Sequence, residues 1–219
     1  MITQHTRTIV SALTLSFALA GVVACKSEVE DKPKAKVEDA GKAEDKPATA
    51  ATGELETLSL AKEGSSIGFI GAKVTGDHKG GFSEFKGSAT VEGDKLSSLE
   101  IIVDMKSISS DDERLTGHLS GADFFEVEKH PEAKFTSLSI TEKAGEGGAT
   151  HEIAGNLELK GEAKKITFPA TIHVKDGSVH GKAAFSIDRK QWGITYPGKP
   201  DDLIKDDVAL ELELSFPKG

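Results

Sequence analysis

Apolar residues recur at every second position through most of the chain after residue 54, and this alternation is the feature that most constrains the fold. Leu99, Ile101 and Val103 alternate with polar neighbours, and residues 208–216 repeat the pattern. Side chains two residues apart lie on one face of a strand. The pattern therefore predicts a sheet with one apolar face, which must be covered by a second sheet or by closure of the sheet on itself.

Breaks rich in glycine or in aspartate and asparagine separate the alternating segments, as is typical of turns between strands. Asp176-Gly177 lies between two such segments and predicts a two-residue hairpin. Pro169 interrupts an alternating segment and is most simply an edge or bulge position. We expect strands over 55–62, 65–75, 81–92, 96–106, 132–142, 150–161, 164–175, 178–188 and 206–216. Such a set fits either a two-sheet sandwich or an up-and-down barrel.

Residues 111–135 interrupt this series of strands and help to choose between the two folds. An aspartate at either of the first two positions can cap a short helix that carries Leu115 and Leu119 on one face. Phe124-Phe125 would then lie over one end of whatever the strands enclose. A plug at one end suits a barrel better than a sandwich.

Residues 1–24 resemble an export signal, because an apolar run from Ile9 to Ala24 follows positively charged residues and is short for a membrane span. The run leads into Cys25, and the preceding small residues resemble the bacterial lipobox, in which the cysteine is lipidated. Cys25 is the only cysteine of the chain and cannot form an internal disulfide. The alternative is an ordinary signal peptide cleaved elsewhere. We expect attachment to a membrane through Cys25 in a Gram-negative cell envelope, on the periplasmic face or at the outer membrane.

Residues 25–54 mix lysine, acidic residues, alanine and proline, with almost no large apolar side chain. Such a composition does not bury enough surface to fold. We expect a disordered tether with an r.m.s. span of roughly 30 Å, which lets the domain float clear of the membrane. Residues 55–219 then form one domain.

The remaining chemistry of the chain excludes several classes of function. A formal net charge of −9 argues against binding to nucleic acid. No two histidines have a zinc-ligand spacing on one helix, so we expect no metal site. The sequence has no nucleophile elbow, phosphate-binding glycine loop or dinucleotide fingerprint. We therefore expect no catalytic residues and no cofactor.

Several motifs together resemble the YceI-like family of exported lipid-binding proteins, and the resemblance covers essentially the whole domain. They are Ser66-Ile67-Gly68-Phe69, Gly81-Phe82 with Phe85 and Gly87, Asp123-Phe124-Phe125-Glu126-Val127, His130-Pro131 with Phe135, Gly155-Asn156-Leu157, and Asp188-Arg189 before Trp192-Gly193-Ile194. The family usually has a bulkier aromatic residue, often tyrosine, where His130 stands, so the ligand need not be the same. The resemblance implies an all-β, eight-stranded, antiparallel, lipocalin-like barrel with a short helical insert. It also implies a long apolar guest such as a polyisoprenoid or a quinone-like chain.

The expected barrel assigns candidate ligand-binding residues to the cavity wall as a set, although the core is the simpler place for any one phenylalanine. They are Phe69, Phe82, Phe85, Ile101, Val103, Met105, Leu119, Phe124, Phe125, Phe135, Leu157, Phe168, Phe185 and Trp192. His78 and His118 are candidates for contact with a ligand headgroup, with exposed loop histidines as the alternative. The competing functions are a structural or partner-recruiting envelope module with a fully packed barrel and an envelope hydrolase, for which the sequence offers no nucleophile. The oligomeric state is not predicted.

Overall fold

The computed structural model describes residues 27–42 and 54–219; the expected signal peptide and Cys25 lie outside them. Strands dominate, with one short α-helix, α1 (Glu113–Ser120), and three 3-10 turns, at Met105–Ser107, Glu146–Gly148 and Arg189–Trp192. The strands are β1 (Lys36–Asp39), β2 (Leu55–Ser59), β3 (Ala61–Lys73), β4 (Asp77–Phe82), β5 (Phe85–Glu92), β6 (Lys95–Asp104), β7 (Ile108–Ser110), β8 (Glu132–Glu142), β9 (His151–Leu159), β10 (Glu162–Lys175), β11 (Ser178–Asp188), β12 (Gly198–Lys199) and β13 (Asp202–Phe216). No helix in these two ranges is long and apolar enough to cross a membrane.

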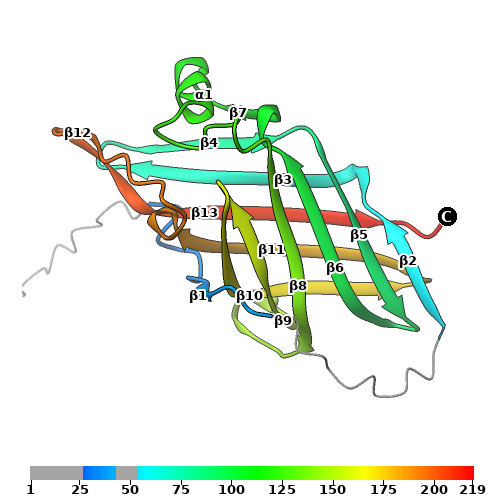
Figure 1. Ribbon diagram of the computed structural model, residues 1–219. Helices are drawn as coiled ribbons and strands as arrows, with labels where there is room; N and C mark the ends of the chain where they lie inside the picture. The colour runs from blue at the N-terminus through cyan, green and yellow to red at the C-terminus, as the bar shows by residue number, and fades with distance from the viewer. Residues whose placement is uncertain (1–26, 43–53) are drawn as a thin grey trace, which may run out of the picture.

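The sheet is antiparallel and curls back on itself (Figure 1). Its neighbours follow the order β5-β6-β8-β9-β10-β11-β13-β3. The two ends of this order meet because β2 and β3 are separated only by Leu60, and β2 pairs with β5 while β3 pairs with β13. The expected all-β, curled antiparallel fold with one helical insert is confirmed. The number of strands differs from eight, because β1, β7 and β12 add to the sheet and long strands are divided at bends.

The strands β10 and β11 pair along only part of their length, and Pro169 lies near the point where they separate. β10 pairs with β11 from Thr171 onward, whereas its earlier residues, up to Thr167, pair with β1 instead. Pro169 lies between these two paired stretches and has no N–H to donate to a neighbouring strand. The expected edge position of this proline is thus confirmed at a seam in the barrel wall.

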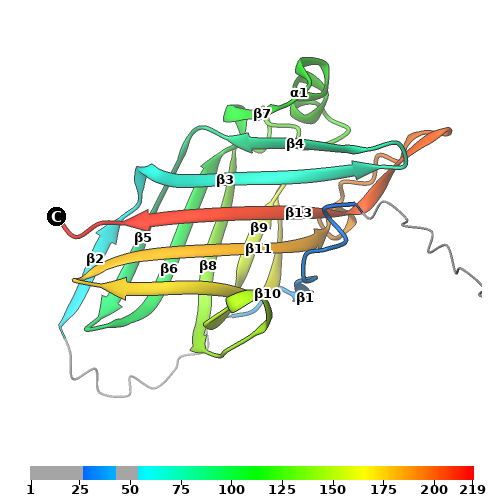
Figure 2. The ribbon, with the colours of Figure 1, turned by 180° about the vertical axis from the view of Figure 1, so that it is seen from behind.

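The N-terminal segment 27–42 fills this seam, which corrects the expectation of a disordered tether for these residues. The N–H of Ala35 donates to the carbonyl of Ser186 on β11 (2.8 Å), and β1 pairs with β10 through the register Val37↔Ile166. Figure 2 shows the segment crossing the outside of β13 and β11 to reach β10. A low apolar content did not prevent folding, because strand pairing to an existing edge satisfies the backbone groups of the segment.

The same segment covers a small apolar patch on the outer face of the barrel. Val29 is only 1% exposed and packs with Ile70, Ala72 and Ala209, which point outward from β3 and β13. Burial of a valine side chain contributes roughly 1.5–3 kcal/mol. Four ion pairs flank this contact: Glu28–Lys79, Glu30–Lys205, Lys32–Glu211 and Lys34–Asp207. Exposed ion pairs contribute little individually, so the apolar contact and the strand pairing provide most of the attachment.

The helical insert begins at Asp112, whose carboxylate accepts the N–H groups of Arg114 (2.8 Å) and Leu115 (3.0 Å). These hydrogen bonds satisfy two of the free donors of the first turn. Of the two expected caps, Asp112 therefore takes the role. Asp111 instead accepts a hydrogen bond from the N–H of Lys79 (3.2 Å). Leu119 is buried, so the helix presents its predicted apolar face to the barrel.

Candidate functional site

The barrel encloses a cavity of about 240 Å³ whose wall is almost entirely apolar. A water-sized group occupies about 30 Å³ of a liquid, so the cavity has room for roughly eight methylene-sized groups without movement of the wall. Residues from β3, β4, β6, β8, β9, β10, β11 and β13 and from α1 contribute to the wall. The interior is therefore not fully packed by the side chains of the protein.

Alternation along the strands produces this wall. On β13, Val208, Leu210 and Leu212 point into the cavity, whereas Glu211 and Glu213 point outward to Lys32 and Lys182. Because successive side chains of a strand point to opposite faces, a strict alternation on every strand gives one apolar inner surface. Twelve of the expected wall residues are found there: Phe69, Phe82, Ile101, Val103, Met105, Leu119, Phe124, Phe125, Phe135, Leu157, Phe168 and Phe185.

Three aromatic rings form one side of the cavity. Phe168 stacks on Phe185 with ring centroids 4.1 Å apart, and Phe135 lies 5.7 Å from Phe168 in a tilted arrangement. Gly155 makes room for this group, because a Cβ atom at that position would lie 2.4 Å from the Phe135 ring. The three rings come from β8, β10 and β11, so their contact depends on the strand order as well as on the sequence.

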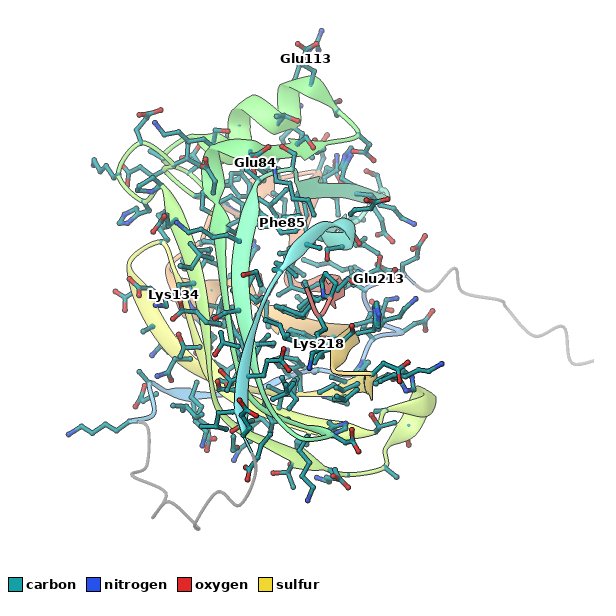
Figure 3. The ribbon with its side chains drawn as sticks, turned by 90° about the vertical axis from the view of Figure 1, so that its right-hand side faces the viewer. Glu84, Phe85, Glu113, Lys134, Glu213 and Lys218 are labelled. Atoms are coloured by element: carbon teal, nitrogen blue, oxygen red, sulfur yellow. The ribbon has the colours of Figure 1, made fainter. Side chains whose placement is uncertain are left out.

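Phe85 and Trp192 do not lie on the cavity wall, and their expected place is corrected. Phe85 is the first residue of β5, beside the bend where the β2–β3 strand separates from it (Figure 3), and its half-buried side chain packs against the main apolar core without reaching the cavity. Trp192 is fully buried, and its indole N–H donates to the carbonyl of Leu157 (3.1 Å). It therefore packs as a core residue in the turn that follows β11.

One end of the cavity is closed by the helical insert. Leu119 and Phe124 pack with Ile108 and Ile194 in a separate apolar cluster. Phe124 also contacts the ring of His118 edge to face, at 4.9 Å between centroids. The prediction that the aromatic pair after the helix lies over one end of the enclosed space agrees with this arrangement.

The two candidate headgroup histidines occupy different places. His78 borders the cavity, and its Nδ1 lies 2.9 Å from a carboxylate oxygen of Asp111. This hydrogen bond holds the pKa of the Asp111 carboxyl below its ordinary value. His118 is not on the cavity wall; its Nε2 lies 2.9 Å from Asp123, and its ring packs against Phe124 and Tyr196. Contact of either histidine with a ligand stays a prediction.

Four cationic residues border the cavity, and the charged end of each pairs with an acidic side chain. The pairs are Lys73–Asp202 (2.9 Å), Lys134–Glu100 (2.7 Å), Lys182–Glu213 (2.7 Å) and Arg189–Asp206 (3.6 Å). Among residues 27–42 and 54–219, no group of three histidine, cysteine or acidic side chains is placed to hold a metal ion.

Most of the aliphatic residues of the wall were not among the predicted residues, which are largely aromatic. Leu96, Leu99, Ile153, Leu159, Ile166, Ile172, Leu210, Leu212, Leu214 and Phe216 also line the cavity. The signal that identifies them is the same alternation that predicted the strands. Every inward position of a barrel strand is a candidate, whatever its residue type.

The part of the chain that resembles known proteins is the barrel. The family model of the YceI-like domain matches residues 58–216. A UPF0312 protein of Pseudomonas putida (strain W619) is 31% identical over 140 residues, which cover 60% of this chain and 71% of the relative.

Two solved structures share the fold. BcnA of Burkholderia cenocepacia matches with a TM-score of 0.61 and 20% identity, over 72% of this chain and 99% of that one. A polyisoprenoid-binding domain from Saccharophagus degradans matches with a TM-score of 0.59 and 14% identity, over 76% of this chain and 100% of that one.

Proposed function

Since the chain belongs to the YceI-like domain family, we propose that it binds or carries a long apolar lipid, polyisoprenoid or quinone-like, inside its barrel and catalyses no reaction. The observation that carries this proposal is the cavity inside the barrel, whose wall is almost entirely apolar. The description of the Saccharophagus degradans neighbour as a polyisoprenoid-binding domain is in keeping with such a guest.

The size of the cavity sets the scale of the expected affinity. Each buried methylene contributes roughly 0.8 kcal/mol, so eight of them supply about 6 kcal/mol before the costs of association. A longer chain gains further binding free energy only if the wall moves to enlarge the cavity. Otherwise the remainder of the chain lies outside the cavity and is not buried there. Affinity then depends mainly on the length of the apolar chain, and selectivity between similar lipids is modest.

The proposal places the protein in the cell envelope of a Gram-negative bacterium, on the periplasmic face or at the outer membrane, as a lipoprotein attached through Cys25. Its support is the sequence of residues 1–25, in which an apolar run leads into the only cysteine. A lipidated cysteine carries acyl chains, and two or more of them give stable anchoring.

Gly181 provides a direct test of the cavity. It lies on the cavity wall, and a Cβ atom added there meets no heavy atom within 4 Å. Gly181→Leu should therefore fill part of the cavity without disturbing the wall. Gly117→Leu is the matched control, because Gly117 is exposed on α1, is not on the wall and also has free space around its Cβ position.

The full chain is purified from an exporting host, extracted with organic solvent and examined by mass spectrometry. We expect an isoprenoid-type lipid in the extracts of the wild type and Gly117→Leu, and at least about tenfold less in that of Gly181→Leu. Added geranylgeraniol should raise the melting temperature of the delipidated wild type and control only. A lipid-free extract and an unchanged melting temperature for the wild type would instead favour a structural or partner-recruiting module.

A further inference from the structure

Two exposed apolar side chains meet at one end of the barrel. Among the described residues the exposed large apolar side chains are Leu55 (57%), Val74 (70%) and Leu203 (49%). Val74 and Leu203 are neighbours, since the N–H of Val74 donates to the carbonyl of Leu203 (3.1 Å). Val74 lies in the β3–β4 turn and Leu203 is the second residue of β13, beside the β12–β13 turn; the two turns extend together at the end away from the C-terminus (Figures 1 and 2). We call this pair of residues the apolar tip.

The two turns of the apolar tip are braced against each other. The carboxylate of Asp202 accepts a hydrogen bond from the hydroxyl of Thr75 (2.9 Å) and pairs with Lys73 (2.9 Å). The hydrogen bonds from Lys73 and Thr75 hold the pKa of Asp202 below its ordinary value, so the brace stays ionised at neutral pH. Val74 and Leu203 are thus held side by side in water, where apolar surface is unfavourable.

The apolar tip adjoins the rim of the cavity. Lys73, which precedes Val74, and Ile204, which follows Leu203, both contribute to the cavity wall. His78 at the start of β4 contributes as well. Val74 and Leu203 are therefore each adjacent in the chain to a residue of the cavity wall, so a surface that contacts the apolar tip also lies close to the rim of the cavity.

The N-terminal segment starts at the same place. The hydroxyl of Ser27 donates to the carboxylate of Asp77 (2.9 Å), three residues after Val74 in the chain. Cys25 precedes Ser27 by two residues, which span at most about 7 Å when extended. Attachment through Cys25, a step taken from the proposed function, thus brings the bilayer to this end of the barrel and not to the end that carries Leu55.

We propose that the apolar tip is a membrane-docking surface, which inserts Val74 and Leu203 into the interface of a phospholipid bilayer. Docking holds the rim of the cavity against the bilayer, and an apolar lipid then passes between bilayer and cavity with little exposure to water. The short connection to Cys25 and the braced turns fix this orientation.

The contact itself is tested with tryptophan at the tip. The full chain is reconstituted in phosphatidylcholine vesicles that contain a brominated phosphatidylcholine, which quenches nearby indole rings. Trp192 is the only native tryptophan and is fully buried, so it gives a constant background. Quenching is expected for Val74→Trp and not for Leu55→Trp. Equal quenching of the two variants, or none for Val74→Trp, overturns the proposal, whatever the barrel binds.

The effect on lipid uptake is tested with geranylgeraniol that carries an anthranilate group, whose arrival near Trp192 is followed by energy transfer. From vesicles, uptake by the variant V74D/L203D should be about tenfold slower than by the wild type, and L55D should match the wild type. Detergent micelles should load all three proteins to the same extent. Unchanged uptake of V74D/L203D from vesicles, or an equal loss from micelles, contradicts docking. A wild type that takes up no probe from either source contradicts the proposed function instead.

Discussion

The N–H of Ala35 donates to the carbonyl oxygen of Ser186 across 2.8 Å, and this bond joins the N-terminal segment to β11 where that strand separates from β10. The N–H of Ser186 in turn donates to the carbonyl of Pro33 (2.9 Å). The two strand edges at the seam are thus both paired: β11 pairs with residues 33–35, and β10 pairs with β1. The segment is part of the barrel wall and not a tether attached to it.

The first prediction concerns this bond. Ala35→Pro removes the donor of a nearly buried hydrogen bond and should lower the free energy of unfolding by about 1–3 kcal/mol. Hydrogen exchange of the β10 amides opposite β1 should accelerate. Ala35→Gly keeps the donor and serves as the control, with a smaller loss of stability and slow exchange. Equal stability of the proline variant and the wild type in thermal unfolding would show that the segment is not anchored by this contact.

The second prediction compares two glycines of the barrel strands, Gly155 on β9 and Gly181 on β11. A Cβ atom at Gly155 would lie 2.4 Å from the Phe135 ring, whereas one at Gly181 would meet no atom within 4 Å. Gly155→Ala should therefore destabilise the fold by about 1–3 kcal/mol and push Phe135 into the cavity. Gly181→Ala should stabilise it by about 0.4–1 kcal/mol, because it restricts the unfolded chain. Urea unfolding of both variants checks the opposite signs.

The third prediction separates two adjacent cations that both pair with Asp206. Arg189 is 4% exposed and donates to the carbonyls of Lys205 (3.1 Å) and Ile194 (2.6 Å). Its planar guanidinium reaches several acceptors at once, which a lysine does not. Arg189→Lys should lower the free energy of unfolding by about 2–4 kcal/mol.

Lys190 is the control for this comparison, because it pairs with Asp206 at the surface (2.9 Å). Lys190→Ala should cost at most about 1 kcal/mol. Chemical denaturation measures both values. A similar loss in the two variants would mean that the buried carbonyls do not depend on Arg189.

The fourth prediction concerns the pH dependence of α1. Hydrogen bonds from the N–H groups of Leu115 and Arg114 hold the pKa of Asp112 below its ordinary value. Because the folded pKa is the lower one, the stabilisation is complete above the ordinary aspartate pKa and disappears as the pH falls through the folded pKa. Protection of the α1 amides from hydrogen exchange should stay constant from about pH 7 to about pH 4 and fall as the pH is lowered further.

Asp112→Asn keeps a capping side chain that does not titrate in this range. Its helix should therefore show less change in protection over the same pH interval. An identical pH profile for the wild type and this variant would assign the change to other carboxylates.

Much of the cavity wall could be predicted, because the position of a side chain on a strand is local information. Phe168 and Leu157 were expected on the wall and lie there, and the aliphatic residues that were missed obey the same alternation. Trp192 was misplaced because it belongs to a turn after β11, where the two-residue period does not apply. Phe85 was misplaced because it lies beside a bend of the barrel.

The sequence by itself determined the strand content, the capped helix and the apolar inner face, because each depends on neighbours within a few residues along the chain. Only the tertiary structure decided that residues 27–42 fold. Val29 and Ala35 have no local apolar partners, and their binding positions are formed by Ala209 and Ser186, more than 140 positions later in the chain. The strand edge to which this segment pairs exists only after the sheet has closed and the strands beside Pro169 have separated. No pattern within residues 27–42 therefore encodes their pairing.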